Sequence, residues 1–86
     1  MHNLGSMYKA GDGVPQDFVK AATWFQKAAE QGVDAAQFSL GLMYENGEGV
    51  PQDLVKAAAW FQKAADQGFS SAQNHLTKCL NALSDN

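Results

Sequence analysis

The chain has 86 residues, of which 45% are hydrophobic and 17% are charged, and its formal net charge is −3. This balance is ordinary for a globular chain and excludes a disordered one, and the length suffices for one small unit. The six basic residues are all lysines. Because there is no arginine, basic stripe or long apolar stretch, we expect neither nucleic-acid binding nor a membrane surface or span.

Cysteine content and the first residues bear on the compartment. Cys79 is the single cysteine, so no intrachain disulfide can form, which agrees with a reducing compartment. Residues 1–11 lack the charged start and apolar core of a secretory signal. We therefore expect a cytoplasmic protein, or a periplasmic or secreted one if the sequence is a fragment of a longer chain.

One cassette occurs twice. It reads GDGVPQDFVKAATWFQKAAEQG at residues 11–32 and GEGVPQDLVKAAAWFQKAADQG at residues 47–68, an offset of 36 residues. Aligning residues 1–36 with residues 37–72 gives 23 identities, and a third, partial copy begins at Ala72. Self-similarity at such a period indicates a stack of helical repeats.

The first two predicted helices belong to the first copy. Over residues 1–10, Leu4, Met7 and Tyr8 fall on one face of a helix. A second helix is predicted from Pro15 to Gln31, because proline suits a first helical turn and apolar residues then recur at steps of three and four. Its apolar stripe is so wide that helices must cover it on two sides.

The next predicted helix spans residues 35–46. Gly32 should end the helix before it in a Schellman motif, with a left-handed glycine after the last turn. A capping box of Asp34 and Gln37 should start the helix over 35–46, and Gly47 should end it.

Two more helices are predicted, from Pro51 to Gln67 and over residues 71–83. Gly41 leaves bare backbone for a following helix to pack against, whereas its counterpart in the last helix is Thr77. We therefore interpret the last helix as the C-terminal cap that a solenoid needs. The domain plan is a single domain over 1–86, with repeat 1 at about 1–32, repeat 2 at about 34–68 and the capping helix at about 70–83.

The pattern LGxMYxxGxGVPQDxVKAAxWFQKAAxQG, present at residues 4–32 and 40–68, strongly resembles the Sel-one-like repeat, a relative of the tetratricopeptide repeat. The resemblance covers residues 4–83. It implies an all-α fold, an α/α superhelix of antiparallel helix pairs, used chiefly as an adaptor for protein–protein contact, often in bacteria. A branch with a cysteine pair in each repeat has been linked to binding or hydrolysing β-lactams. Because this chain has no such pairs, that activity is a disfavoured alternative.

Residues with catalytic or metal-binding chemistry are scarce. His75 and Cys79 are spaced to share one helix face, but two ligands do not close a zinc site, and the other histidine, His2, is at the opposite end of the chain. We expect a packed Cys79 and a surface His75. Trp24 and Trp60 are interpreted as core between repeats rather than as ligand platforms. The sequence predicts no enzyme, no catalytic residue, no cofactor and no metal.

Local ion pairs are the simplest interpretation of one spacing that occurs in both copies of the cassette. Asp17 and Lys20 are three residues apart near a predicted helix start, and Asp53 and Lys56 repeat the arrangement. Such pairs support a helix by a few tenths of a kcal/mol.

One stripe of positions remains as a candidate binding surface. It consists of the outward positions on the first helix of each repeat: Phe38, Leu42 and Glu45, with Ser6 and Lys9 in the copy before and Asn74, Lys78 and Asn81 in the copy after. In tetratricopeptide-like superhelices this stripe lines the concave face, so the resemblance makes it a candidate groove with two apolar anchors amid polar residues. An alternative for Phe38 is a hydrophobic staple onto Val33.

The sequence thus predicts a non-enzymatic module that binds a peptide or another protein along this groove. Two alternatives use the same scaffold differently. The apolar helix over residues 1–10 has no repeat before it, so it could pair with another copy in a homodimer. The chain could also be the N-terminally truncated segment of a longer repeat scaffold.

Overall fold

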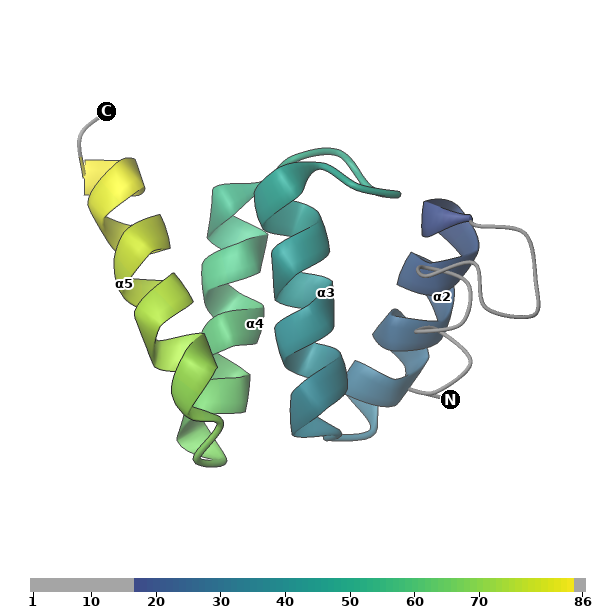
Figure 1. Ribbon diagram of the computed structural model, residues 1–86, viewed down its shortest axis with the longest axis horizontal. Coiled ribbons are helices and arrows are strands. Elements are labelled where there is room, and N and C mark those ends of the chain that lie inside the picture. The colour runs from purple at the N-terminus through teal and green to yellow at the C-terminus, as the bar shows by residue number, and fades with distance from the viewer. Residues whose placement is uncertain (1–16, 85–86) are drawn as a thin grey trace.

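Four helices stand side by side in the computed structural model, which describes residues 17–84 (Figure 1). They are α2 (Phe18–Glu30), α3 (Asp34–Asn46), α4 (Leu54–Asp66) and α5 (Ser70–Ser84). Each packs against the next, and residues 17–84 contain no strand. The predicted all-α superhelix of helix pairs is confirmed: α3 and α4 form one pair, and α5 opens the next. The helix predicted over residues 1–10 lies outside the described residues.

Helices α2 and α4 begin later than predicted. Pro51 lies outside α4, and the true N-caps are Asp17 and Asp53. Each aspartate accepts a hydrogen bond at 3.0 Å from the backbone N–H three residues on, that of Lys20 or Lys56. The predicted aspartate–lysine pairs therefore act through the lysine backbone. Because a cap satisfies an otherwise unpaired N–H, its effect is about 1 kcal/mol, larger than that of a surface ion pair.

The first cassette ends in the predicted Schellman motif, and the second cassette ends in the same way. After α2, Gly32 has a φ of +90°, its N–H donates to the Ala29 carbonyl, and the Val33 N–H donates to the Ala28 carbonyl at 3.2 Å. The same two bonds recur after α4, around Gly68. These hydrogen bonds satisfy the last carbonyls of each helix and turn the chain toward the next one.

The capping box predicted for α3 is wrong. The N-cap is Val33, with no side-chain cap, and the Asp34 carboxylate accepts a hydrogen bond from the adjacent Ala35 N–H. Gln37 is buried instead, where its amide donates to the Ala29 carbonyl and its oxygen accepts a hydrogen bond from Gln67. A buried amide needs both partners, so Gln37 is used to join the ends of α2, α3 and α4.

The core consists of two clusters linked across the repeats. The first holds buried alanines of α2 with Phe25, Leu40 and Met43, and the second holds Phe61, Leu76 and Cys79 with alanines of α4 and α5. Trp60 belongs to α4 but packs against the first cluster, which confirms its predicted place between repeats. Trp24 is half-buried, with the Lys27 ammonium 4.8 Å from the centre of its ring.

A bare stretch of backbone on α3 lets α4 approach closely, as predicted. A Cβ atom placed on Gly41 would lie 2.6 Å from the ring of Phe61, a separation that real side chains do not tolerate. Phe61 is fully buried in this contact. None of the helices described over residues 17–84 is long and apolar enough to cross a membrane.

Candidate partner-binding face

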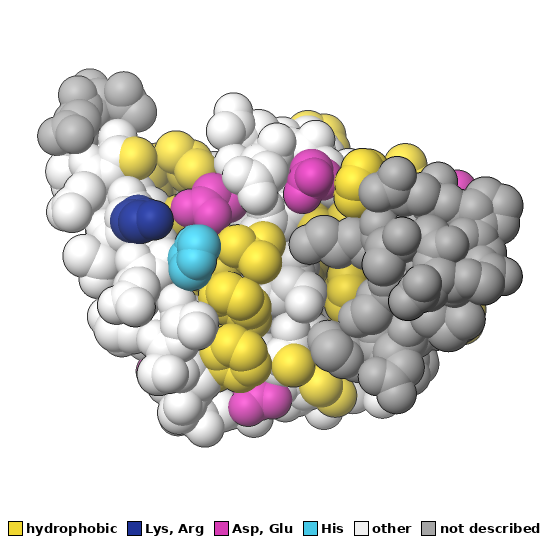
Figure 2. Space-filling view, in the orientation of Figure 1, with side chains coloured by type: hydrophobic (Ala, Val, Ile, Leu, Met, Phe, Trp, Pro, Cys, Tyr) yellow, Lys and Arg dark blue, Asp and Glu magenta, His cyan; other side chains and the backbone are white. Residues whose placement is uncertain are grey.

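The predicted stripe falls on two neighbouring helices of the stack. We call its described members the α3–α5 face: Phe38, Leu42 and Glu45 from α3, and Asn74, Lys78 and Asn81 from α5. Figure 2 shows hydrophobic side chains gathered between α3 and α5, bordered by polar ones on the α5 side. The other two predicted members, Ser6 and Lys9, lie outside the described residues.

Phe38 is the centre of a cluster of rings between the two helices. Its ring stacks on Phe69 at 4.9 Å between centroids, meets Phe61 at 5.7 Å, and meets the edge of His75 at 5.3 Å. Its ring neighbours thus come from α4, from α5 and from the turn between them. Phe38 and Leu42 are half-buried against the second core cluster. Phe38 is therefore part of the packing and also partly open to solvent.

Glu45 is turned toward α5. One carboxylate oxygen lies 3.3 Å from Nδ1 of His75, and the other accepts a hydrogen bond from the Cys79 thiol at 3.6 Å. The side chains of His75 and Glu45 are 29% and 20% exposed, so His75 lies at the surface but is partly buried against its neighbours. The His75 ring fills the space beside Phe38 and Phe61 and holds the two helices together.

Cys79 is a packed cysteine, as predicted, with only 1% of its surface exposed. Burial raises the pKa of its thiol to about 11, and the charge and hydrogen bond of Glu45 add to the shift. At neutral pH the sulfur is therefore a protonated donor, and a nucleophile or metal ligand requires the thiolate. Among residues 17–84, no group of three or more histidine, cysteine or acidic residues is arranged to hold a metal.

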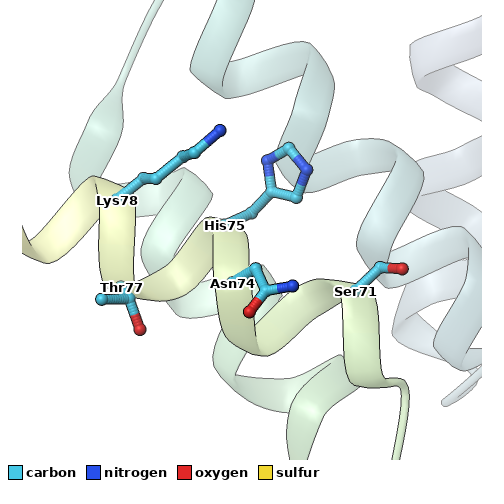
Figure 3. Close-up of a pocket in the computed structure, with 5 residues that line it drawn as sticks. All are labelled: Ser71, Asn74, His75, Thr77 and Lys78. Carbon is cyan, nitrogen blue, oxygen red and sulfur yellow. The ribbon is translucent and has the colours of Figure 1, made fainter.

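The α5 side of the face is polar and open. Ser71, Asn74, His75, Thr77 and Lys78 line a shallow hollow of about 540 Å³ (Figure 3). Asn74, Lys78 and Asn81 are all exposed. The Thr77 hydroxyl donates to the backbone carbonyl of Gln73, and His75 is paired with Glu45, so Ser71, Asn74 and Lys78 are the lining side chains that can face solvent or a ligand.

Two residues of this face were missed by the repeat alignment. Phe69 and His75 have Val33 and Ser39 as counterparts one repeat earlier, so neither stands out as a repeated feature. The expected stacking of the repeats could nevertheless have predicted contacts between these two helices. Because α3 and α5 are equivalent helices of successive repeats, inward-leaning side chains on their facing sides must meet.

The equivalent helices α2 and α4, nearly identical in sequence, bury their alanines against neighbouring helices, which is the arrangement of an α/α repeat protein. The sequence comparisons are specific about the kind of repeat. The family model for the Sel1 repeat matches residues 1–33 and 34–69. The chain therefore belongs to the Sel1 repeat family, as the resemblance to the Sel-one-like repeat predicted.

Two solved bacterial structures are similar to this chain. A Sel1 repeat protein from Oxalobacter formigenes superposes with a TM-score of 0.86 at 41% identity, over 87% of this chain. The protein c5321, a protective antigen of uropathogenic Escherichia coli with an SLR fold, has a TM-score of 0.83 at 46% identity, over 84% of this chain. None of the curated proteins matches the chain.

The chain spans only 31% and 15% of the lengths of these two proteins. Both relatives are thus several times longer than the aligned segment. Sel1 repeats generally serve as scaffolds for protein–protein interaction and are typically not enzymes.

Proposed function

We propose that this chain is a non-enzymatic module that binds a peptide or protein segment along the α3–α5 face. One observation carries the proposal. The stacked and half-buried rings of Phe38 and Phe69, which we call the Phe38–Phe69 column, lie beside α5. The exposed polar side chains of α5, those of Asn74, Lys78 and Asn81, have no partner within residues 17–84. An anchor pocket with adaptable hydrogen-bonding groups around it is the usual composition of a peptide-binding surface.

Several polar side chains on α2 and α4 are already engaged. On α2 and α4, Lys27 and Lys63 lie over the rings of Trp24 and Trp60, and Gln26 and Gln62 donate hydrogen bonds to the acidic residue four positions on. These side chains already interact within their own helix. The α3–α5 face is different because its sequence changes between repeats while the backbone position stays the same. Variation on a constant frame is how repeat proteins acquire different partners.

Substituting Phe38 and Leu42 would be a poor test, because both contact the second core cluster and their loss would also weaken the fold. We therefore place bulk on exposed positions instead. Asn74→Trp combined with Asn81→Trp should block the face, whereas Val55→Trp combined with Ala59→Trp adds the same bulk to the exposed side of α4.

The measurement is affinity capture with quantitative mass spectrometry on three immobilised proteins, the wild type and the two double variants. We expect a bound set shared by the wild type and the α4 variant and lost from the α5 variant, with unchanged circular dichroism for all three. Binding retained by the α5 variant would refute the assignment of the face.

The predicted alternatives make separate demands. Pairing through residues 1–10 requires a dimer, so sedimentation velocity over a concentration series tests it, and a monomer throughout excludes it.

The absence of enzymatic activity is tested against the β-lactam alternative by incubation with nitrocefin. We expect no turnover, because the chain has a single cysteine and lacks the cysteine pairs of the branch linked to β-lactams.

A further inference from the structure

The charge on α5 is unusual for this chain. The protein as a whole is acidic, with a net charge of −3, yet the 15 residues of α5 include no aspartate or glutamate. Lys78 is the only residue of α5 with a permanent positive charge. A partner that approaches this helix therefore meets a positive group and several neutral hydrogen-bond donors.

Lys78 also differs from the other described lysines. Lys27, Lys56 and Lys63 lie over the aromatic rings of Trp24, Tyr44 and Trp60. Lys20 also has a contact of its own. Within residues 17–84, the Lys78 ammonium alone has no such partner, and it borders the hollow that contains Ser71 and Asn74 (Figure 3).

The nearest acidic residue on the face does not compete for Lys78. Glu45 directs one oxygen to His75 and the other to Cys79, so both oxygens are used inside the seam between α3 and α5. Lys78 is consequently the exposed charge of α5, whereas the Glu45 carboxylate, 20% exposed, is held on the α3 side of the face by His75 and Cys79. An exposed ammonium without a partner can pair with a carboxylate, and the Asn74 amide and the Ser71 hydroxyl are further neutral donors along the same hollow.

We propose that the α5 hollow binds a carboxylate of a peptide whose apolar side chain packs on the Phe38–Phe69 column. This inference rests on the proposed function and names the chemistry of the partner. Ser71 and Lys78 are seven residues apart on one helix, which corresponds to about 10 Å, or about three residues of an extended peptide. The carboxylate is that of an aspartate or glutamate side chain, which we place two to four residues from a leucine or phenylalanine.

The test uses two pools of dye-labelled synthetic hexapeptides. The acidic pool carries leucine or phenylalanine with aspartate or glutamate two to four residues later, and the basic pool has lysine in place of each acidic residue. Binding to wild type is compared with Lys78→Glu and with Lys63→Glu, which makes the same change in net charge on α4. Fluorescence anisotropy is measured at low and high salt.

The proposal predicts that wild type prefers the acidic pool, and that Lys78→Glu weakens this binding by about tenfold, while Lys63→Glu changes it by less than about twofold. Binding should weaken with added salt, because the contact is between charges near the surface. Equal binding of both pools, preference for the basic pool, or binding that survives Lys78→Glu would overturn it.

The same data separate this inference from the proposed function. If both pools bind equally and Asn74→Trp with Asn81→Trp blocks both, the face is a binding surface without a carboxylate site. If the two tryptophans block neither pool, or if neither pool binds, the carboxylate site is refuted and the face loses its support. A dimer that Lys78→Glu dissociates would identify a second copy, rather than an acidic peptide, as the occupant.

Discussion

Helices α3 and α5 occupy the same position in successive repeats, but their surroundings differ. Helix α3 is packed by α2 on one side and α4 on the other, whereas α5 packs chiefly against α4. Two equivalent positions carry different residues in the two helices: Gly41 and Tyr44 on α3 correspond to Thr77 and Leu80 on α5. Gly41 admits a ring of α4 and Tyr44 contacts both core clusters, while Leu80 is 49% exposed. The same helix of the repeat thus lies in the interior of the stack as α3 and at its end as α5, and the side chains at these positions differ accordingly.

The largest expected effect comes from removing the ring that fills the interior seam. Phe61→Ala should lower the free energy of unfolding by about 3–5 kcal/mol, because a fully buried ring leaves a cavity between α3, α4 and α5. Leu80→Ala, at the open end, should cost less than about 1 kcal/mol. Urea unfolding followed by circular dichroism gives both values, and similar losses in the two variants would contradict a distinction between seam and end.

Exchanging the residues of seam and end should have unequal consequences. Gly41→Thr places a side chain where even a Cβ would lie 2.6 Å from Phe61, so we expect a loss of about 1–3 kcal/mol or more. Thr77→Gly, the reverse change, should cost less than about 1 kcal/mol, which is the helix propensity of glycine. The two variants are compared by thermal and urea unfolding. A tolerated Gly41→Thr would show that α4 does not need bare backbone.

The seam between α3 and α5 should also give a pH dependence through Cys79. The thiol has its pKa raised from 9.0 to about 11 in the folded protein, so folding favours the neutral form. Its contribution to stability is therefore complete below about pH 9 and is lost as the pH rises toward 11, at about 1.4 kcal/mol per unit of pKa shift.

Because lysines and tyrosines titrate in the same range, the quantity to measure is the difference between wild type and Cys79→Ala. This difference in unfolding free energy should shrink from pH 8.5 to 10.5. In Glu45→Gln the pKa of the thiol should be raised less, since the carboxylate contributes to the shift. Parallel stability curves for wild type and Cys79→Ala would contradict the buried, protonated thiol.

Much of the fold could be predicted because its signals are local. The 36-residue offset predicted the stacked helices, and glycines at fixed places predicted the helix ends at Gly32 and Gly47 and the close approach at Gly41. The helix starts were placed too early because proline suits a first turn, while the decisive group was the aspartate side chain two residues later. The sequence allows the helix to start at the proline or at the aspartate, and the hydrogen bond to the aspartate side chain in the structure decides between them.

The candidate face was predicted only in outline, for a different physical reason. Glu45 contacts His75 and Cys79, which are 30 and 34 residues away, and these pairs involve residues that are not repeated. Comparing repeats shows what is common to them and therefore hides such pairs. Gln37 is a similar case. Its place in the sequence suits a capping box, but its side chain forms hydrogen bonds with Ala29 and Gln67, which come within reach only when the helices are stacked.

The most direct test of the binding face is an NMR titration of the isotope-labelled chain with the tightest-binding hexapeptide of the acidic pool. Our account predicts that amide shifts change along α3 and α5, at Leu42, Asn74, Lys78 and their neighbours, and stay unchanged on the exposed sides of α2 and α4. Changes concentrated on α2 or α4, with α5 unaffected, would contradict it.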